Sequence, residues 1–323
     1  MTTTRNARDV AEHAIGERGE LILRLESGRL DVTAVDGEVA TIRELDGRDL
    51  GERFVVERSE GRLSLRPRDH AIFDIGRGRR GRGNARLAAE VPRNATISLD
   101  TASGELNATG LRGEQRYRTA SGDITIADVS GPIAIDAVSG EVRVEATGPV
   151  ELSGRLVSGD LAVRGGTLRS LALATTSGDI ELGSPIDGPG PFSIQSVSGD
   201  ASVVMAGDGL RVEAQTLTGD ISSAVGHHAD SGMGRRALVV GDGAMTLAFK
   251  SLSGDLQVSA GAASHARDGA VPAPPAPAMT RQDAPPDPMA DLRLDVLRDL
   301  EAGRIDIAVA TERLADLDEP TNG

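Results

Sequence analysis

The sequence predicts an all-β fold, a parallel β-solenoid with turns of 18–21 residues, on three observations. First, the tripeptide Ser-Gly-Asp, or a close variant, recurs along the chain. Second, apolar and polar residues alternate in short stretches between these tripeptides. Third, aromatic residues make up only 2% of a chain that is 39% hydrophobic, so Val, Ile, Leu and Ala must build the core. Such side chains suit thin, repetitive β-structure.

The glycine of the tripeptide defines the repeat. Its spacing is 18, 18, 19, 19, 21 and 20 residues, and an eighth copy follows after an insertion. A fixed period of about 20 residues is typical of solenoids in which each turn stacks on the next. The glycines are Gly104, Gly122, Gly140, Gly159, Gly178, Gly199, Gly219 and Gly254.

One turn, residues 121–138, shows how the repeat is built. Residues 124–126 and 133–135 alternate, and Gly131-Pro132 lies between them. The alternation predicts two short strands with one buried face, and the Gly-Pro pair predicts the corner between them. Stacking the turns about 4.8 Å apart would bury a continuous aliphatic core. The crossover preference of parallel strands predicts right-handed winding.

A bend is expected just before each tripeptide, because the apolar step lengthens there from two residues to three. From Val138 onward, Gly140 and Val142 share one parity. Ser139 and Glu141 are therefore expected to face solvent.

The solenoid is predicted to span residues 20–260, with irregular turns in 20–100 and regular turns in 101–260. In the irregular part, Gly28 and Gly61 each begin a glycine-then-alternation pattern. Irregular ends are expected, because the terminal turn of a solenoid needs a polar cap. The insertion Gly226–Arg236 is expected to loop out from one edge.

The last part of the chain is predicted to be a separate device. Residues 261–288 are rich in Ala and Pro and predict a semi-rigid, disordered linker. Residues 289–319 switch to helical spacing on both sides of Gly303, which predicts a small helical hairpin. The hairpin is expected to dock a protein partner or a second copy of the chain; the alternative is that it caps the solenoid. The candidate docking residues are Leu292, Val296, Leu300, Ile307, Leu314 and Leu317.

The stretch Glu90–Leu106, with its Val91-Pro92 entry followed by the Ser-Gly-Asp series, resembles a known family. It is similar to the bacterial adhesin-like β-strand-repeat proteins, a family of unknown function. The resemblance covers residues 20–260 and implies a β-helical fold and a prokaryotic source, without a known reaction or catalytic residues. The tail, Leu292–Leu317, looks like the short C-terminal helical segments of such bacterial proteins.

Charge and composition exclude several classes of function. Residues 101–260 carry 19 acidic and 11 basic side chains, a net charge of −8, and residues 261–323 carry 12 and 6, a net charge of −6. An acidic surface repels phosphate backbones, which argues against nucleic acid as a ligand. The chain has no cysteine, and residues 1–19, expected to be flexible, hold no signal-peptide-like run. The chain has no run of about 18 apolar residues, so we expect no membrane span. We expect a cytoplasmic protein.

Stacked turns would place the acidic residues of the tripeptides in one column. Neighbouring carboxylates about 4.8 Å apart repel by roughly 0.9 kcal/mol even in water. Bound cations, interleaved arginines, or hydrogen bonds from Ser and Gly amides at each bend would offset this cost, and we favour the hydrogen bonds. The candidate cation ligands are Asp123, Glu141, Asp160, Asp179, Asp200 and Asp220.

Other motifs carry less information. Gly76–Gly81 matches the dinucleotide-binding string GxGxxG, but Arg82-Gly83-Asn84 follows where that site needs a helix. Its arginines, with Arg86, are interpreted as a basic loop. His227, His228 and Asp230 are interpreted as a polar loop rather than a metal site, since neighbouring side chains point different ways.

The sequence therefore predicts a non-enzymatic scaffold or protein-interaction module without a cofactor: an acidic β-solenoid with a tethered docking hairpin. The first alternative is an exported or surface adhesin-like binding protein. The second is a glycan-active parallel β-helix enzyme. A single Tyr and four Phe leave few aromatic platforms for sugar rings, which disfavours the enzyme.

Overall fold

The computed structural model describes residues 9–68, 84–188, 190–205, 209–224, 227–232, 235–241 and 245–260. The chain divides into two units, Met1–His265 and Ala266–Gly323, and every described residue belongs to the first. The predicted linker and helical hairpin, with the six candidate docking residues, lie outside the described residues, as does the basic segment 76–82.

The described residues form one sheet of 20 strands and one short helix, α1 (Leu50–Arg53). Asp49 caps α1 by accepting a hydrogen bond from the Gly51 N–H at 2.8 Å. No helix in these ranges is long and apolar enough to cross a membrane. The strands are β1 (Val10–Ala14), β2 (Glu20–Val35), β3 (Val39–Glu44), β4 (Phe54–Ser59), β5 (Arg62–Pro67), β6 (Ala85–Pro92), β7 (Thr96–Thr109), β8 (Gln115–Ser121), β9 (Ile124–Ser139), β10 (Val142–Ser158), β11 (Leu161–Ser177), β12 (Ile180–Ile186), β13 (Phe192–Ser198), β14 (Ala201–Met205), β15 (Gly209–Thr218), β16 (Ile221–Ser223), β17 (His227–Gly232), β18 (Arg235–Gly241), β19 (Met245–Ser253) and β20 (Leu256–Ala260).

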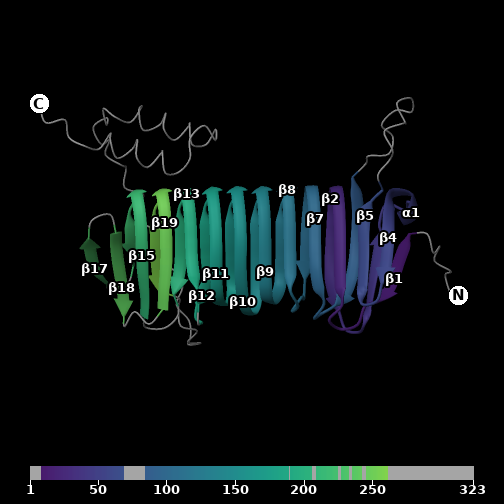
Figure 1. Ribbon diagram of the computed structural model, residues 1–323, viewed down its shortest axis with the longest axis horizontal. Helices are drawn as coiled ribbons and strands as arrows, with labels where there is room; N and C mark the ends of the chain where they lie inside the picture. Colours follow the sequence, from purple (N-terminus) through teal and green to yellow (C-terminus); the bar gives the residue numbers. More distant parts are fainter. Residues whose placement is uncertain are drawn as a thin grey trace, which may run out of the picture. The chain divides into compact units, whose positions relative to one another are not determined.

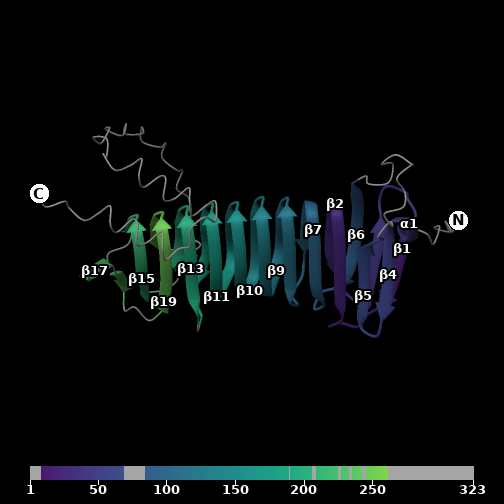
Figure 2. The same cartoon turned by 45° about the horizontal axis from the view of Figure 1, so that its top comes forward.

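The central turns stack in parallel and in register, as the repeat predicts (Figures 1 and 2). Val142 of β10 pairs with Ile124 of β9 on one side and with Leu161 of β11 on the other. All three side chains are buried, because residues of the same parity meet inside every turn. The parallel, solenoid-like sheet with an aliphatic core is therefore confirmed, and right-handed winding stays a prediction.

The spatial order of the turns differs from their sequence order near the C-terminal end of the sheet. Ser253 of β19 pairs with Ser198 on one side and with Thr218 on the other, so β19 lies between β13 and β15 (Figure 1). The expected order, with the Gly219 turn next to the Gly199 turn, is wrong. Pairing depends on matching edges and faces, which strands distant in the chain can supply.

The prediction that the insertion after β16 loops out is wrong. The described residues of the insertion form an antiparallel hairpin, β17–β18, and β18 pairs with β15. This pairing satisfies N–H and C=O groups that β15 would otherwise present at an open edge. The hairpin therefore caps the sheet, which explains why the repeat pattern is interrupted here.

The N-terminal end shows a similar rearrangement. Gly28 of β2 pairs with Gly104 of β7 on one side and with Ala85 of β6 on the other, while β1, β3 and β4 add antiparallel pairs. The prediction that Gly61 begins a turn equivalent to that of Gly28 is wrong. Gly61 has a φ of +69° in the hairpin between β4 and β5, because those strands run antiparallel.

The glycines of the tripeptides form a column in which backbones touch. A Cβ atom added to Gly159 would lie 2.1 Å from the carbonyl oxygen of Gly140, and Gly159 has a φ of +150°. Corresponding contacts at the other tripeptide glycines measure 2.0–2.3 Å. Both the space and the backbone conformation therefore require glycine.

The bend before the tripeptide differs in detail from its prediction. Val138 has the parity of the inward-facing Val142, yet its side chain is 52% exposed, while the neighbouring Ala137 is buried. The chain turns between Ala137 and Gly140, so alternation does not carry across the bend. Val138 is thus outside the core, although its parity indicated an inward position.

Tyr117 and Gln115 form a polar pair in the core. Tyr117 is fully buried and donates a hydrogen bond from its hydroxyl to Oε1 of Gln115 at 2.9 Å. The Gln115 amide nitrogen donates to the carbonyl oxygen of Ser130 at 3.1 Å. Burial raises the pKa of the Tyr117 hydroxyl, because the phenolate would lose its hydration.

Replacing Gly159 with Ala is expected to lower the unfolding free energy by about 3 kcal/mol or more, because the new methyl group meets backbone and the conformation is strained. Thermal unfolding followed by circular dichroism measures the effect. Gly183→Ala is the matched control, because its added Cβ would contact other atoms only at 3.4 Å. Equal melting temperatures for the two variants would contradict the backbone contact.

The chain has one Tyr and no Trp, so tyrosinate absorbance reports on Tyr117 alone. We expect no titration near the ordinary pKa of about 10 while the protein stays folded. Because the pKa of Tyr117 is higher in the folded than in the unfolded chain, the neutral hydroxyl contributes fully to the free energy of unfolding below pH 10. This contribution is lost as the pH rises above 10. Ionisation near pH 10 with unchanged circular dichroism would contradict the buried position.

Candidate functional site

The Ser-Gly-Asp edge is the line along which the tripeptides of successive turns meet. It carries a hydroxyl column and an acidic column, which the parallel register places one residue above another. In spatial order, the hydroxyl column is Ser103, Ser121, Ser139, Ser158, Ser177, Ser198, Ser253 and Thr218, and the acidic column is Glu105, Asp123, Glu141, Asp160, Asp179, Asp200, Asp255 and Asp220.

Asp179 shows the contact that repeats along the acidic column. Its backbone N–H donates to Oδ1 of Asp160 at 2.9 Å, and its own Oδ1 accepts the backbone N–H of Asp200 at 2.9 Å. Equivalent bonds join Asp123 to Glu141, Asp200 to Asp255, and Asp255 to Asp220. Each of these aspartates therefore binds the backbone of the following turn.

These bonds explain how like charges tolerate a column. A carboxylate that accepts a backbone N–H gains a charge-assisted hydrogen bond that offsets repulsion from its neighbours. The predicted donors, Ser and Gly amides, are wrong: the donor is the backbone N–H of the acidic residue in the following turn. The offset could be anticipated from the spacing, but the donor depends on how the bend orients each amide.

Where glutamate replaces aspartate, arginine contributes instead. Glu141 lies 2.5 Å from Nη2 of Arg143, and Glu105 lies 3.1 Å from Nη1 of Arg29. The longer side chain reaches across the surface, and neither glutamate accepts a backbone N–H of the next turn in the described chain. Interleaved arginine is thus a local feature of two turns.

The hydroxyl column also binds the preceding turn. Ser139 Oγ donates to the carbonyl oxygen of Ala120 at 3.2 Å, and Thr218 Oγ1 donates to the carbonyl oxygen of Leu252 at 3.1 Å. These hydroxyls satisfy carbonyl groups at the bend, where the ladder is interrupted. Side chains of both polar columns therefore stabilise the stacking of turns by binding the backbone of a neighbouring turn.

The described ranges contain no group of three or more His, Cys, Asp or Glu residues that could hold a metal ion. The carboxylates proposed as cation ligands are brought together only as a single file. Cation binding by Asp123, Glu141, Asp160, Asp179, Asp200 and Asp220 stays a prediction. His227, His228 and Asp230, interpreted as a loop, instead have their backbone in β17.

A polar cluster that the sequence did not indicate lies at the opposite corner. Asp128 has a φ of +53°, and its Oδ1 accepts hydrogen bonds from Arg112 Nη2 and Thr147 Oγ1, both at 2.8 Å. The bond from Arg112, followed by that from Thr147, lowers the pKa of Asp128. Arg112 also donates to the Asp128 carbonyl oxygen, so the cluster holds three turns together at this corner.

A shallow hollow lies on the outer face formed by β8, β9, β10 and β11. Its lining includes the small residues Ala134, Ser153 and Ala172 and the charged residues Arg116 and Glu151. Arg116 faces Glu114 at 3.8 Å. No signal in the sequence pointed to the hollow, because it arises where small outward residues of adjacent turns coincide.

Comparisons with known proteins find one family model and several solved structures of low identity. The model of the Toastrack DUF4097 family matches residues 15–259. No curated protein matches the chain. Among solved structures, a "putative adhesin" from Bacteroides fragilis NCTC 9343 is 13% identical, with a TM-score of 0.34 over 77% of this chain and 95% of that one. A "putative lipid binding protein" from Parabacteroides distasonis ATCC 8503 is 14% identical, with a TM-score of 0.36 over 78% and 96%.

Replacing Asp179 with Ala removes the acceptor for the Asp200 N–H and is expected to lower the unfolding free energy by about 1 kcal/mol. Asp179→Asn is the matched control, because its amide oxygen still accepts that bond. The asparagine variant loses one repelling charge and the charge assistance of the bond together, so it should melt close to the wild-type temperature and above Asp179→Ala. If both variants melt equally, the hydrogen bond contributes nothing.

Proposed function

The chain belongs to the Toastrack DUF4097 family, and we propose that it is a non-enzymatic binding protein, a β-repeat scaffold that carries a partner-docking tail. The family supports the resemblance to β-strand-repeat proteins of unknown function. The scaffold itself is argued from the tripeptide, and the tail from its helical spacing.

The observation that carries the proposal is that the repeated polar groups bind backbone. Asp160, Asp179, Asp200 and Asp255 each accept an N–H of the following turn. Acid–base catalysis by two carboxylates needs different environments for the acid and the base. Here successive carboxylates share one environment, which suits a framework better than a glycan-active site.

The tail supplies the docking element of this proposal. Residues 289–319 place Leu292, Val296 and Leu300 at helical spacing, and a hairpin of this size buries too little apolar surface to be stable alone. Contact with a partner would cover that surface. The Pro- and Ala-rich linker 261–288 gives the hairpin reach, which a simple cap would not need.

Crosslinked co-purification from the native cell tests this function. The full chain carrying Leu292→Ser, Val296→Ser and Leu300→Ser is expected to lose partners that the wild-type chain retains. The matched control replaces the intervening charged residues, Arg293, Asp295 and Asp299, with Ser. Partners that survive the apolar substitutions would contradict docking by the tail.

Fractionation of the same cells separates the scaffold from the adhesin-like alternative. A cytoplasmic chain with tail-dependent partners fits the scaffold. A chain recovered at the cell surface or in the medium would favour the exported binder instead.

A further inference from the structure

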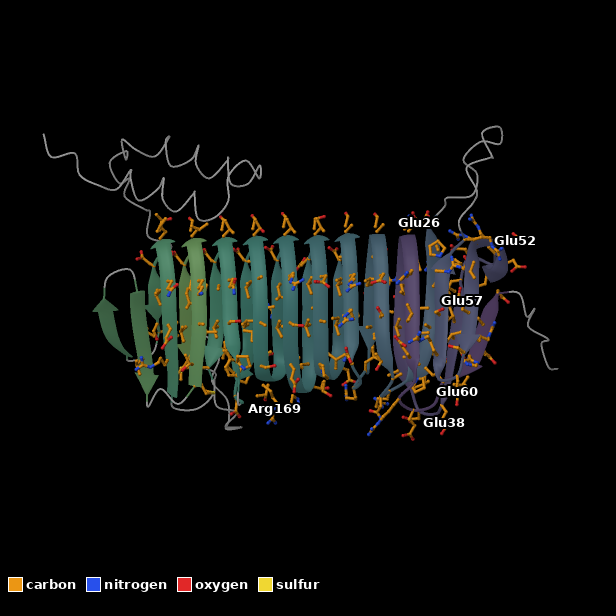
Figure 3. All side chains as sticks on the ribbon, viewed as in Figure 1. Glu26, Glu38, Glu52, Glu57, Glu60 and Arg169 are labelled. Carbon is orange, nitrogen blue, oxygen red and sulfur yellow. The ribbon has the colours of Figure 1, made fainter. Side chains whose placement is uncertain are left out.

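A row of mostly aliphatic side chains, each exposed or half-buried, follows the Ser-Gly-Asp edge. Each residue of the row immediately precedes the Ser or Thr of a tripeptide, and Glu26, labelled in Figure 3, marks the same position in β2. Further along the edge, six successive turns place only aliphatic residues and one threonine there. We call these the aliphatic ridge: in spatial order, Val138, Val157, Thr176, Val197, Leu252 and Leu217.

Three residues of the ridge are exposed, and the other three, Thr176, Val197 and Leu252, are half-buried. Val138 is 52% exposed, Val157 50% and Leu217 41%, and these are three of the five exposed large hydrophobic residues in the described chain. The other two, Val39 and Leu45, lie near the opposite end of the sheet. Single exposed apolar residues are ordinary on protein surfaces, whereas a continuous row indicates an interaction site.

Charge identifies the kind of partner. Three residues after each ridge position lies an acidic residue, so an unbroken acidic flank accompanies the ridge: Glu141, Asp160, Asp179, Asp200, Asp255 and Asp220. Asp160, Asp179, Asp200 and Asp255 form no ion pair with any described residue. Their negative charge is therefore available to a cationic partner.

The other flank lies two residues before each ridge position and is nearly neutral. It consists of Asp136, Arg155, Ala174, Gln195, Lys250 and Gln215. A ligand on the ridge thus meets strong negative charge on one side only. This asymmetry favours a partner with apolar residues in a stripe and basic residues along one border of it.

The spacing of the ridge favours a helix. Neighbouring turns of the sheet lie about 4.8 Å apart, so six positions span about 24 Å. An α-helix laid along the ridge presents apolar residues at about 5.4 Å per turn, whereas an extended strand presents one face at about 6.8 Å. The helical repeat is the closer match, and a helix of about 16 residues would cover the ridge.

Charge also argues against the nearest competing occupants. The predicted hairpin of this chain, residues 289–319, carries nine acidic residues and four arginines, so the acidic flank repels it. A second copy would bring its own acidic flank to the contact. An anionic membrane surface is repelled for the same reason.

We propose that the aliphatic ridge and its acidic flank bind a basic amphipathic helix of a partner protein. The apolar stripe of that helix covers Val138, Val157 and their neighbours, and its Lys or Arg residues lie beside the aspartates. The site is independent of the docking tail. Failure of the tail experiment therefore leaves this proposal intact, and the reverse also holds.

The probe is a fluorescein-labelled synthetic peptide of about 18 residues, with Leu at helical spacing and Lys along one border of the Leu stripe. Fluorescence anisotropy with the full-length chain measures its affinity. A matched peptide with Glu in place of Lys is expected not to bind. Equal binding of both peptides, or no binding of the Lys peptide, would overturn the proposal.

Substitutions in the chain locate the binding. Val138→Thr, Val157→Thr and Val197→Thr together keep β-branched shape and repeat what Thr176 already provides. The triple variant is expected to weaken Lys-peptide binding by roughly tenfold or more, because the helix loses apolar contact. Val39→Thr, which alters a residue that is 46% exposed elsewhere, should bind as the wild type does. Wild-type affinity in the triple variant would overturn the proposal.

Charge is tested separately from folding. Asp160→Asn, Asp179→Asn and Asp200→Asn together retain the oxygen that accepts the next turn's N–H. This variant is expected to bind the Lys peptide more weakly than wild type at low salt, with the difference lost at about 1 M salt, where charges are screened. Analytical ultracentrifugation measures the oligomeric state of the wild type and of the triple Val→Thr variant. A wild-type dimer that the Val→Thr substitutions dissociate would assign the ridge to a second copy of the chain and contradict the proposal.

Discussion

The structure depends on the close approach of successive backbones at the Ser-Gly-Asp edge. Each glycine carbonyl oxygen lies so close to the glycine of the next turn that a Cβ atom there would clash with it. A Cβ added to Gly159 would lie 2.1 Å from the carbonyl oxygen of Gly140. This contact lets the chain turn within a single strand spacing and return in register. Parallel pairing, the aliphatic core and both polar columns follow from that register, because one shifted turn would turn every inward side chain outward.

The same register aligns the carboxylates of successive turns and lets each aspartate bind the backbone of the next turn. A column of carboxylates is unfavourable alone, yet Asp160 and Asp179 each hold the N–H of the next turn. Aspartate is short enough for this bond, whereas Glu141 pairs with Arg143. The acidic edge is thus stabilised by internal contacts while its charge stays exposed, and the aliphatic ridge beside it forms an asymmetric surface.

Much of the fold could be predicted, because each regular turn repeats the same local pattern. Alternation at residues 124–126 and 133–135 identified the buried faces, and the glycine period identified the stacking. Features that break the period were not accessible in this way. Val138 has inward parity but lies outside the bend, and Asp128 gains its role only when Arg112 and Thr147 of neighbouring turns converge on it.

The sequence by itself determined the repeat, the aliphatic composition of the core and the column of acidic residues. These properties depend on local spacing, which every turn contains. Only the tertiary structure decided that β19 lies between β13 and β15, that β17 and β18 cap the sheet, and that each aspartate from Asp160 to Asp255 accepts the backbone N–H of the acidic residue in the following turn. Those outcomes depend on which edges and amides meet in space, because strand pairing and bend geometry join residues that the linear pattern keeps apart.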